Sequence, residues 1–337
     1  MKIESNYSLL RHNSFGLEVS TSWFIEYNTT DELQRILSDE YFRELRSLHI
    51  GAGSNLLFIN NFNGIIIHSA IKGISIYDET EQSVFLRVGA GEKWDDTVAY
   101  AAEKGWGRIE NLSLIPGETG AAAVQNIGAY GVEIKDVIES VEAYNQQTGE
   151  QRIFTADECK YSYRNSIFKD EQTDPYIITH VTLRLSKKPV FQLKYGNLHE
   201  RLADCGTLTP KKVRESVIAI RRSKLPDPQQ LGNAGSFFMN PIVSSEVYKQ
   251  LIIKYPDMPS YPVSDDEIKI PAGWLIEQCG LKGIRDGEVG TYQHQALVIV
   301  NYGKATGPEI ALFAAQITEQ VMERFGIELT PEVRYVG

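Results

Sequence analysis

Residues 106–135 restrict the fold of this chain more than any other segment. They begin WGRIENLSLIPGETGAAAVQNIGAYGVEI and are rich in glycine and alanine, with little charge. Glycine accepts backbone conformations that other residues avoid, and its missing side chain lets a neighbouring group come close to the main chain. The segment therefore indicates backbone that lies directly against something, which is either the rim of a β-sheet or a bound ligand.

A second glycine-containing segment, GAGSNLLF at residues 51–58, follows a short predicted strand. It has neither the GxGxxG pattern that enters a helix nor the ending of a Walker loop, because strand-like residues follow Asn55. Glycines let successive N–H groups point at one anion, and Ser54 and Asn55 add side-chain donors. Taken alone, the segment is equally well explained as a tight structural turn.

The two glycine-containing segments together predict a particular kind of ligand. They lie about 60 residues apart and each adjoins predicted strands, which fits a large flat molecule with a pyrophosphate in its middle. The small side chains of residues 116–131 would let backbone approach a flavin ring, and Gln125 and Asn126 offer hydrogen bonds to its polar edge.

The composition is that of a folded protein without a basic surface. The chain has 337 residues, which is enough for two or three domains. Its net charge is −10 and its sequence pI is about 5.2, which argues against nucleic-acid binding. The N-terminal residues MKIESNYSLLRHN contain no signal-peptide core, and no stretch approaches the roughly 20 apolar residues of a membrane helix.

Cysteine and histidine usage argues against a metal site. Cys159, Cys205 and Cys279 are far apart and odd in number, which suits a reducing cytoplasm and forms neither a metal pattern nor a disulfide framework. The six histidines are scattered, without HExxH or a pair at helical spacing. We therefore expect a cytoplasmic protein with no metal and with no nucleic-acid or membrane partner.

Predicted strands and helices are mixed along the chain without strict β-α-β alternation, which predicts an α+β fold rather than one doubly wound sheet. Capping boxes are expected where Thr29 precedes Glu32 and where Thr306 precedes Glu309. The expected strands are 22–28, 48–50, 64–68, 176–186 and 295–301, the hairpins 75–90 and 137–154, and the helices 93–105, 211–224, 244–256, 272–280 and 306–326.

Five polar side chains are further candidates for chemistry. Ser236 lies in NAGSFFMNP between a glycine and two phenylalanines, Arg164 lies among aromatic residues in YSYRNSIFK, and Lys224 belongs to the basic cluster of RRSKLPDP. Glu332 lies in LTPEVRY and Tyr195 in LKYGNL. Each also has an ordinary structural explanation: a loop serine, a stacked arginine, a solvated helix end, an exposed strand residue or a turn aromatic.

Eight strings of this sequence, in their order along the chain, resemble the UDP-N-acetylenolpyruvoylglucosamine reductase (MurB) family of bacterial peptidoglycan synthesis. They are GAGSNLLF, LIPGETGAAAVQNIGAYGVEI, YSYRNSIFK, RRSKLPDP, GNAGSFFMNP, AGWLIEQCGLKG, QALVIVN and TPEVRYVG. The resemblance runs from Asn13 to Gly337, almost the whole chain. LKYGNL at Tyr195 resembles the tyrosine-loop (type I) form of the family.

The resemblance implies an α+β fold with an FAD-binding domain of the vanillyl-alcohol-oxidase (PCMH) type. Two lobes at 1–72 and 73–210 would be followed by a smaller substrate-binding domain at 211–326, with the C-terminal strand 327–337 returning to the first lobe. The implied cofactors are FAD and NADPH, and the expected state is a monomer. NADPH would reduce the flavin, and UDP-N-acetylglucosamine enolpyruvate would then be reduced to UDP-N-acetylmuramate.

Three catalytic residues follow from the resemblance. Arg164 and Glu332 match the family's catalytic arginine and glutamate, and Ser236 matches its proton donor. Hydride from flavin N5 would reach C3 of the enolpyruvyl group, and the charge that builds at C2 needs a fixed cation and a proton donor. Arginine supplies the cation, a serine hydroxyl can protonate a carbanion, and a glutamate can stabilise the enol form.

The resemblance also implies binding residues for the cofactor and the substrate. The cofactor residues would be Gly51, Ala52, Gly53, Ser54, Asn55, Leu56, Pro116, Gly117, Thr119, Gly120, Ala122, Gln125, Asn126, Gly128, Ala129, Tyr130 and Gly131, with the pyrophosphate held by 51–57. The substrate residues would be Tyr195, Lys224, Asn240 and Gln295.

Two positions depart from the family pattern. Met239 stands where many relatives have lysine, which shifts the expected contact with the substrate diphosphate to Lys224. Ser14 replaces a common threonine and keeps the hydroxyl. Two other functions stay open: a flavin oxidase of the same fold that acts on another alcohol, and a protein that binds FAD without turnover. NAGSFF and PEVR together count against the oxidase.

Overall fold

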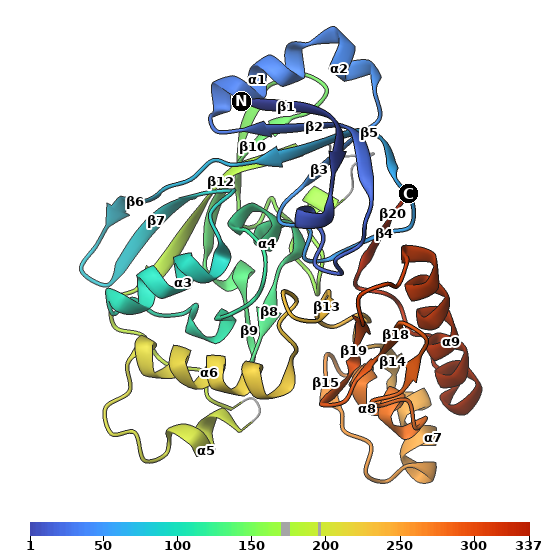
Figure 1. Ribbon diagram of the computed structural model, residues 1–337. Helices are drawn as coiled ribbons and strands as arrows, with labels where there is room; N and C mark the ends of the chain where they lie inside the picture. Colours follow the sequence, from blue (N-terminus) through green and yellow to red (C-terminus); the bar gives the residue numbers. More distant parts are fainter. Residues whose placement is uncertain (170–175, 195–196) are drawn as a thin grey trace. The chain divides into compact units, whose positions relative to one another are not determined.

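The computed structural model describes residues 1–169, 176–194 and 197–337. Contacts between residues divide the chain into two compact units (Figure 1). Unit 1 comprises Met1–Tyr7, Thr21–Ala52 and Asn63–Arg221, and unit 2 comprises Ser8–Ser20, Gly53–Phe62 and Arg222–Gly337.

A four-stranded sheet with two short helices forms the first part of unit 1. Its strand order is β1 (Lys2–Ser8), β2 (Ser20–Tyr27), β5 (Phe62–Ser69) and β3 (Ser47–Ile50). Helix α1 (Thr30–Ser38) begins where the Thr29 hydroxyl accepts the N–H of Glu32, as the predicted cap requires, and α2 (Glu40–Glu44) follows. Apolar side chains of α1 pack with Ile25, Ile65 and Ile67 into one core.

A five-stranded antiparallel sheet forms the second part of unit 1. Its order is β11 (Gln151–Thr155), β10 (Ile138–Asn145), β12 (Tyr176–Ser186), β7 (Ser83–Gly89) and β6 (Ile74–Glu79), so both predicted hairpins are confirmed. Helices α3 (Trp94–Glu103) and α4 (Thr119–Gln125) contribute to its core, where Trp94, Val98 and Ala101 lie buried on the predicted face of α3. Short elements complete this part: η2 (Glu110–Leu112), β8 (Gly128–Ala129), β9 (Val132–Glu133), η3 (Ile134–Asp136) and η4 (Ile167–Lys169).

Helix α6 (Pro210–Lys224) carries the chain from unit 1 into unit 2, because the boundary between the units falls after Arg221. Its buried residues Val213, Val217 and Ile220 pack with the short helix α5 (Leu198–Leu202). These are the residues whose spacing predicted the buried face of this helix.

Unit 2 contains three small sheets and three helices. The sheets are β13 (Gly232–Asn233), β19 (Gln295–Asn301), β18 (Val289–Tyr292) and β17 (Arg285–Asp286); β14 (Ile242–Ser244), β16 (Glu267–Lys269) and β15 (Tyr261–Pro262); and β20 (Arg334–Val336), parallel to β4 (Leu56–Phe58). The helices are α7 (Ser245–Lys254), α8 (Ala272–Gln278) and α9 (Gly307–Phe325). A capping box of Thr306 and Glu309 begins α9, and left-handed Gly326 ends it.

The two units do not coincide with the three predicted domains, whose boundaries stay a prediction. The C-terminal strand β20 pairs with residues 56–58, and both lie in unit 2. Within the described residues, no helix is long and apolar enough to cross a membrane.

Candidate active site

The first half of the glycine-rich segment 116–131 is hydrogen-bonded to residues 90–92, the loop that precedes α3. The N–H groups of Thr119 and Gly120 donate to the carbonyls of Glu92 and Ala90 at 2.8 and 2.9 Å. Thr119, Gly120 and Ala122 are buried. The N–H groups of Thr119 and Gly120 are therefore not available to a ligand, and these buried residues support the segment from within. Pro116 and Gly117 remain accessible.

Asn126 organises the second half of the segment. It ends α4 in a left-handed conformation, with φ of 47°. Its side-chain amide donates to Ser162 O and Glu133 Oε2 at 2.7 and 3.1 Å, and its Oδ1 accepts the N–H of Lys135. The side chain is fully buried. In contrast to the expected hydrogen bond to a flavin, its polar atoms are therefore engaged with protein, and residues 127–130 that follow are half-buried.

Arg164 lies against this half-buried backbone. Its Nη2 and Nη1 donate to the carbonyls of Gly128 and Asn126 at 2.9 and 3.4 Å. A Cβ at position 128 would lie 3.0 Å from Nη1 of Arg164 and 3.0 Å from Cγ of Glu133, so glycine lets the guanidinium come this close. The arginine itself has a φ of 55°, which non-glycine residues rarely adopt. Because such strain clusters at functional sites, the observed backbone agrees with a functional role.

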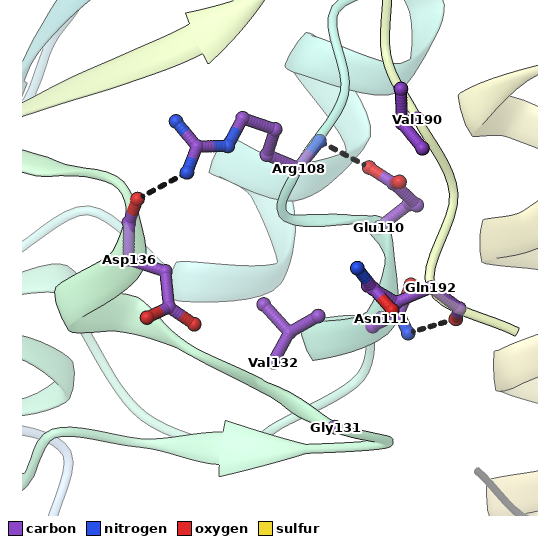
Figure 2. Close-up of a pocket in the computed structure, with 8 residues that line it drawn as sticks. All are labelled: Arg108, Glu110, Asn111, Gly131, Val132, Asp136, Val190 and Gln192. Carbon is purple, nitrogen blue, oxygen red and sulfur yellow. Dashed lines mark hydrogen bonds between the residues drawn. The ribbon is translucent and has the colours of Figure 1, made fainter. Parts of the chain in front are cut away.

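A cavity of about 290 Å³ lies beside the chain at Gly131 and Val132, directly after this half-buried backbone (Figure 2). Its lining includes Arg108, Glu110, Asn111 and Asp136, and Gly131 is the one predicted cofactor residue among its eight lining residues. Burial raises the pKa of the Glu110 carboxyl, which accepts the N–H of Arg108 at 2.8 Å. The Asn111 amide donates to the carbonyls of Tyr130 and Gln192, so it fixes the turn at 130 from the cavity side.

The first glycine-containing segment crosses the boundary between the units. Gly51 and Ala52 belong to unit 1, where a Cβ at position 51 would lie 3.0 Å from the Ala121 Cβ and 3.2 Å from the Glu118 Oε2. The two glycine-containing segments thus touch at Gly51. In unit 2, Gly53 has a φ of +70°, and a Cβ there would lie 1.8 Å from His12 O. A glycine is therefore required at 53 for two independent reasons.

Ser236 stands exposed on a turn of unit 2 that its neighbours hold rigidly. Phe237 and Phe238, which follow Ser236, are both buried, and Gly235 before it has a φ of +70°. Buried Asn233 accepts the N–H of Gly235 at 2.9 Å and donates to Leu231 O at 2.8 Å. The hydroxyl of Ser236 is thus carried by a backbone with little freedom.

Glu332 is joined to the same turn by backbone hydrogen bonds. Its N–H donates to Phe237 O at 2.8 Å, and Met239 N–H donates to Thr330 O at 2.9 Å. The Asn55 amide donates to the Glu332 carbonyl at 3.0 Å. Three predicted site segments, those at 55, 236 and 332, therefore come together in unit 2.

Two of the predicted substrate residues lie in the same part of unit 2. Gln295 begins β19, whose Leu297 carbonyl accepts the N–H of Phe237 at 2.8 Å, and Asn240 accepts the N–H of Ala272 at 2.9 Å. Lys224 ends α6 and is exposed. Tyr195 lies outside the described residues. Of the residues predicted to be catalytic, Arg164 belongs to unit 1, and Ser236 and Glu332 belong to unit 2.

Sequence reasoning missed two sets of residues that support the site. Asn233 was overlooked, although an asparagine two residues before a glycine is a known signal for a side-chain-capped turn. The second set is His68 with Glu26 and Glu118, whose side chains form hydrogen bonds in unit 1. No local pattern links these three residues, which are 42 and 50 positions apart.

Comparison with known proteins defines the class of this chain first. Residues 22–155 match the family described as FAD binding domain. The structure of UDP-N-acetylenolpyruvylglucosamine reductase from Thermus caldophilus is similar over the whole of both chains, with a TM-score of 0.70 and 23% identity. The fold is therefore α+β and contains an FAD-binding domain, which makes the protein an FAD-dependent oxidoreductase.

The family follows from closer relatives. Residues 227–336 match the family described as UDP-N-acetylenolpyruvoylglucosamine reductase, C-terminal domain. The reductase of that name from Porphyromonas gingivalis is 51% identical over the whole of both chains, and the one from Bacteroides fragilis is 47% identical over 99% of this chain and all of its own. The chain belongs to the UDP-N-acetylenolpyruvoylglucosamine reductase family, whose cofactors are FAD and NADPH.

The residues present fit FAD. The two glycine-containing segments touch at Gly51, and the half-buried backbone at 127–130 lies open beside the Arg164 guanidinium. Backbone that a ligand can approach in this way is what a dinucleotide cofactor requires.

Proposed function

We propose that this chain reduces UDP-N-acetylglucosamine enolpyruvate to UDP-N-acetylmuramate, with electrons from NADPH, as a cytoplasmic step of peptidoglycan precursor synthesis. The observation that carries the proposal is the pairing of the Ser236 turn with the Glu332 segment through the Glu332 N–H and Phe237 O. This pairing keeps an alcohol and a carboxyl group on neighbouring backbone, as delivery of one proton to one carbon requires.

The protein's own residues would then have separate roles. Bound FAD supplies the hydride that reaches C3 of the enolpyruvyl group. Ser236 protonates C2, where negative charge builds. The Glu332 carboxyl group stabilises the enol form of the substrate through a hydrogen bond. Arg164 pairs with the substrate carboxylate, because an arginine is charged at every relevant pH and binds carboxylates through two N–H groups.

The substrate's nucleotide would be held mainly from unit 2. Lys224 contacts the diphosphate, and Asn240 and Gln295 contact the remainder of the substrate. The exposure of Lys224 and the anchoring of Asn240 through Ala272 N–H support these roles. Tyr195, which lies outside the described residues, remains a proposed substrate contact.

A two-step anaerobic experiment tests the proposal. NADPH is added to the oxidised protein, and the enolpyruvyl substrate follows once flavin absorbance is bleached. Ser236→Ala should leave the first step nearly unchanged and slow the second by roughly 10²–10⁴-fold, the usual contribution of a positioned proton donor. Ser264→Ala, at an exposed serine in the turn between β15 and β16, is the matched control and should leave both steps unchanged.

Three outcomes would contradict parts of the proposal. Equal slowing of both steps by Ser236→Ala would make Ser236 a structural residue. Flavin that NADPH reduces but the enolpyruvyl substrate does not reoxidise would favour an oxidoreductase of the same fold with another substrate. A flavoprotein that NADPH does not reduce would favour simple FAD binding.

A further inference from the structure

His68 lies between two carboxylates in unit 1. It stands on β5, and its Nδ1 is 3.0 Å from Oε2 of Glu26 on the neighbouring strand β2. Its Nε2 is 3.1 Å from both carboxylate oxygens of Glu118, the residue before α4. The side chains of His68 and Glu118 are only 10% and 11% exposed, so water cannot replace these contacts easily.

This arrangement favours the charged form of His68. A neutral imidazole has one N–H and one acceptor nitrogen, whereas both ring nitrogens here face carboxylate oxygens and must both donate. Burial alone would lower the pKa of His68, but the hydrogen bonds and charges of Glu118 and then Glu26 outweigh it and raise the pKa above its ordinary value. The two carboxylates therefore favour the protonated form of His68.

Three titratable neighbours of His68 have pKa values that are shifted away from their ordinary values. Burial and repulsion from His68 lower the pKa of His49, on β3, to about 3. Burial raises the pKa of Tyr27, on β2, and a hydrogen bond to Glu4 raises that of Lys2, on β1. The titratable or charged groups on the surrounding elements are Lys2, Glu4, Tyr7, Glu26, Tyr27, His49 and Glu118. Among the histidines of these elements, His68 is the one whose pKa is raised by its carboxylate neighbours.

The position of Glu118 connects this proton with the cofactor. Glu118 is the single charged residue in the two glycine-containing segments 51–58 and 116–131. Its Oε2 lies 3.2 Å from the place that a Cβ of Gly51 would occupy. A carboxylate here would repel a diphosphate at residues 51–57, and an imidazolium shared by Glu118 and Glu26 reduces that repulsion by one positive charge.

We propose that His68 is a positioning residue for FAD: its imidazolium offsets negative charge at Glu118 and holds this side chain beside Gly51, so that FAD binding is coupled to one proton. The coupling rests on the proposed contact of residues 51–57 with the FAD diphosphate. When His68 loses its proton, it can donate to only one of the two carboxylates, and the charge of Glu118 next to the ligand is no longer offset. By linkage, bound FAD must in turn favour the protonated form.

The test measures the dissociation constant of FAD between roughly pH 6 and pH 9, across the ordinary histidine range. Holoprotein is diluted at each pH, and the fluorescence of released flavin gives the bound fraction. The raised pKa means that binding is strongest below it and weakens as pH rises through it. We expect the dissociation constant to rise about tenfold, which corresponds to a shift of one pKa unit in His68 on binding.

Four variants separate the roles of charge and structure. His68→Gln should bind FAD as weakly at every pH as the wild type does at high pH. Glu118→Gln should bind FAD tightly with little pH dependence, and the double variant should recover most of that affinity. His180→Gln is the matched control: His180 is a half-buried unit 1 histidine beside a carboxylate, that of Glu142, and the variant should keep the wild-type profile.

Each contrary outcome has a defined meaning. If Glu118→Gln keeps the wild-type pH profile, or if His68→Gln binds FAD like the wild type, His68 does not couple a proton to FAD. This holds even if His68→Gln folds poorly, because Glu118→Gln carries the test alone. A chain that takes up no FAD at any pH would instead contradict the proposed cofactor contact, while pH-independent binding contradicts the role of His68 alone.

Discussion

Replacement of Asn233 by alanine should disturb proton delivery without touching a reacting group. The Asn233 side chain accepts the N–H of Gly235 at 2.9 Å and donates to the carbonyls of Leu231 and Pro226 at 2.8 and 3.4 Å. The two short hydrogen bonds are worth roughly 0.5–1.5 kcal/mol each, and buried partners left unpaired add to that. We expect the free energy of unfolding to fall by about 2–3 kcal/mol.

The loosened turn should also slow the step that depends on Ser236. With saturating FAD, reduction of the flavin by NADPH should be nearly unchanged in Asn233→Ala, and reoxidation by the enolpyruvyl substrate should slow by about 10–100-fold, because small displacements of a catalytic group are costly. Urea unfolding gives the stability change, and stopped-flow flavin absorbance gives both rates. Asn233→Asp keeps the acceptor for Gly235 N–H and should recover part of the rate.

Asn301→Ala is the matched control for stability loss alone. Asn301 is equally buried in unit 2, accepts the N–H groups of Gly303 and Ala305 at 2.8 and 3.0 Å, and donates to Phe15 O at 2.9 Å. It should lose similar stability and keep the rate of the second step. If both variants slow that step equally, or if Asn233→Ala loses stability at full rate, Asn233 does not position Ser236.

Two further predictions concern substrate affinity and pH. Lys224→Ala should raise KM for the UDP substrate about tenfold, as loss of one charge-assisted hydrogen bond would, with kcat nearly unchanged, whereas Lys211→Ala at the other end of α6 should change neither; an unchanged KM would place the diphosphate elsewhere. Arg214→Met should destabilise the protein by about 1–3 kcal/mol at neutral pH, discounted because the Asp95 side chain is 27% exposed. Burial opposes a lower pKa of Asp95, but hydrogen bonds from Arg214 and the Leu114 N–H outweigh burial and lower it. The stability that the ion pair contributes is therefore fully present above the pKa of Asp95 in the unfolded chain, and it should vanish as pH falls through the pKa of Asp95 in the folded protein. Urea unfolding of wild type and variant across pH measures the difference, and a constant difference would contradict the role of the ion pair.

Elements with strong local signals were predictable from the sequence. Helix α9 combines a capping box, a proline in its first turn, an apolar stripe and a terminal glycine, and each signal favours the same boundaries. Helix α3 and strand β12 are similar, since their apolar patterns match the observed burial. Local propensity and tertiary packing agree in these elements.

Helix α4 was not predicted, because its local signals conflict. Glycine-rich sequence argues against a helix, whereas Ala121–Ala123 favour one, and the buried Ala122 and Ala123 in the core of unit 1 decide the outcome. Strand β1 was missed because its side chains are mostly exposed and polar. Tertiary contacts that no local window contains determine both elements.

The residues of the candidate site also divide into those that local sequence indicates and those that only tertiary contacts define. Ser236, Arg164 and Glu332 were predicted from long family-specific strings, whereas the hydrogen-bond partners of Asn233 and His68 are visible only in the fold. The carboxylates of Glu26 and Glu118 reach His68 from another strand and from the start of a helix. A sequence shows the residue types of such a cluster but not their meeting point.

The two supporting groups rely on different physics, and this difference separates their effects in one experiment. Asn233 holds the Ser236 turn with neutral hydrogen bonds that no pH near neutrality alters, whereas His68 holds Glu118 through a proton that it can lose. With saturating FAD, the pH profile of the second step therefore reports the reacting groups alone. With limiting FAD, the same profile also contains the His68 proton, and the difference between the two profiles isolates cofactor retention from catalysis.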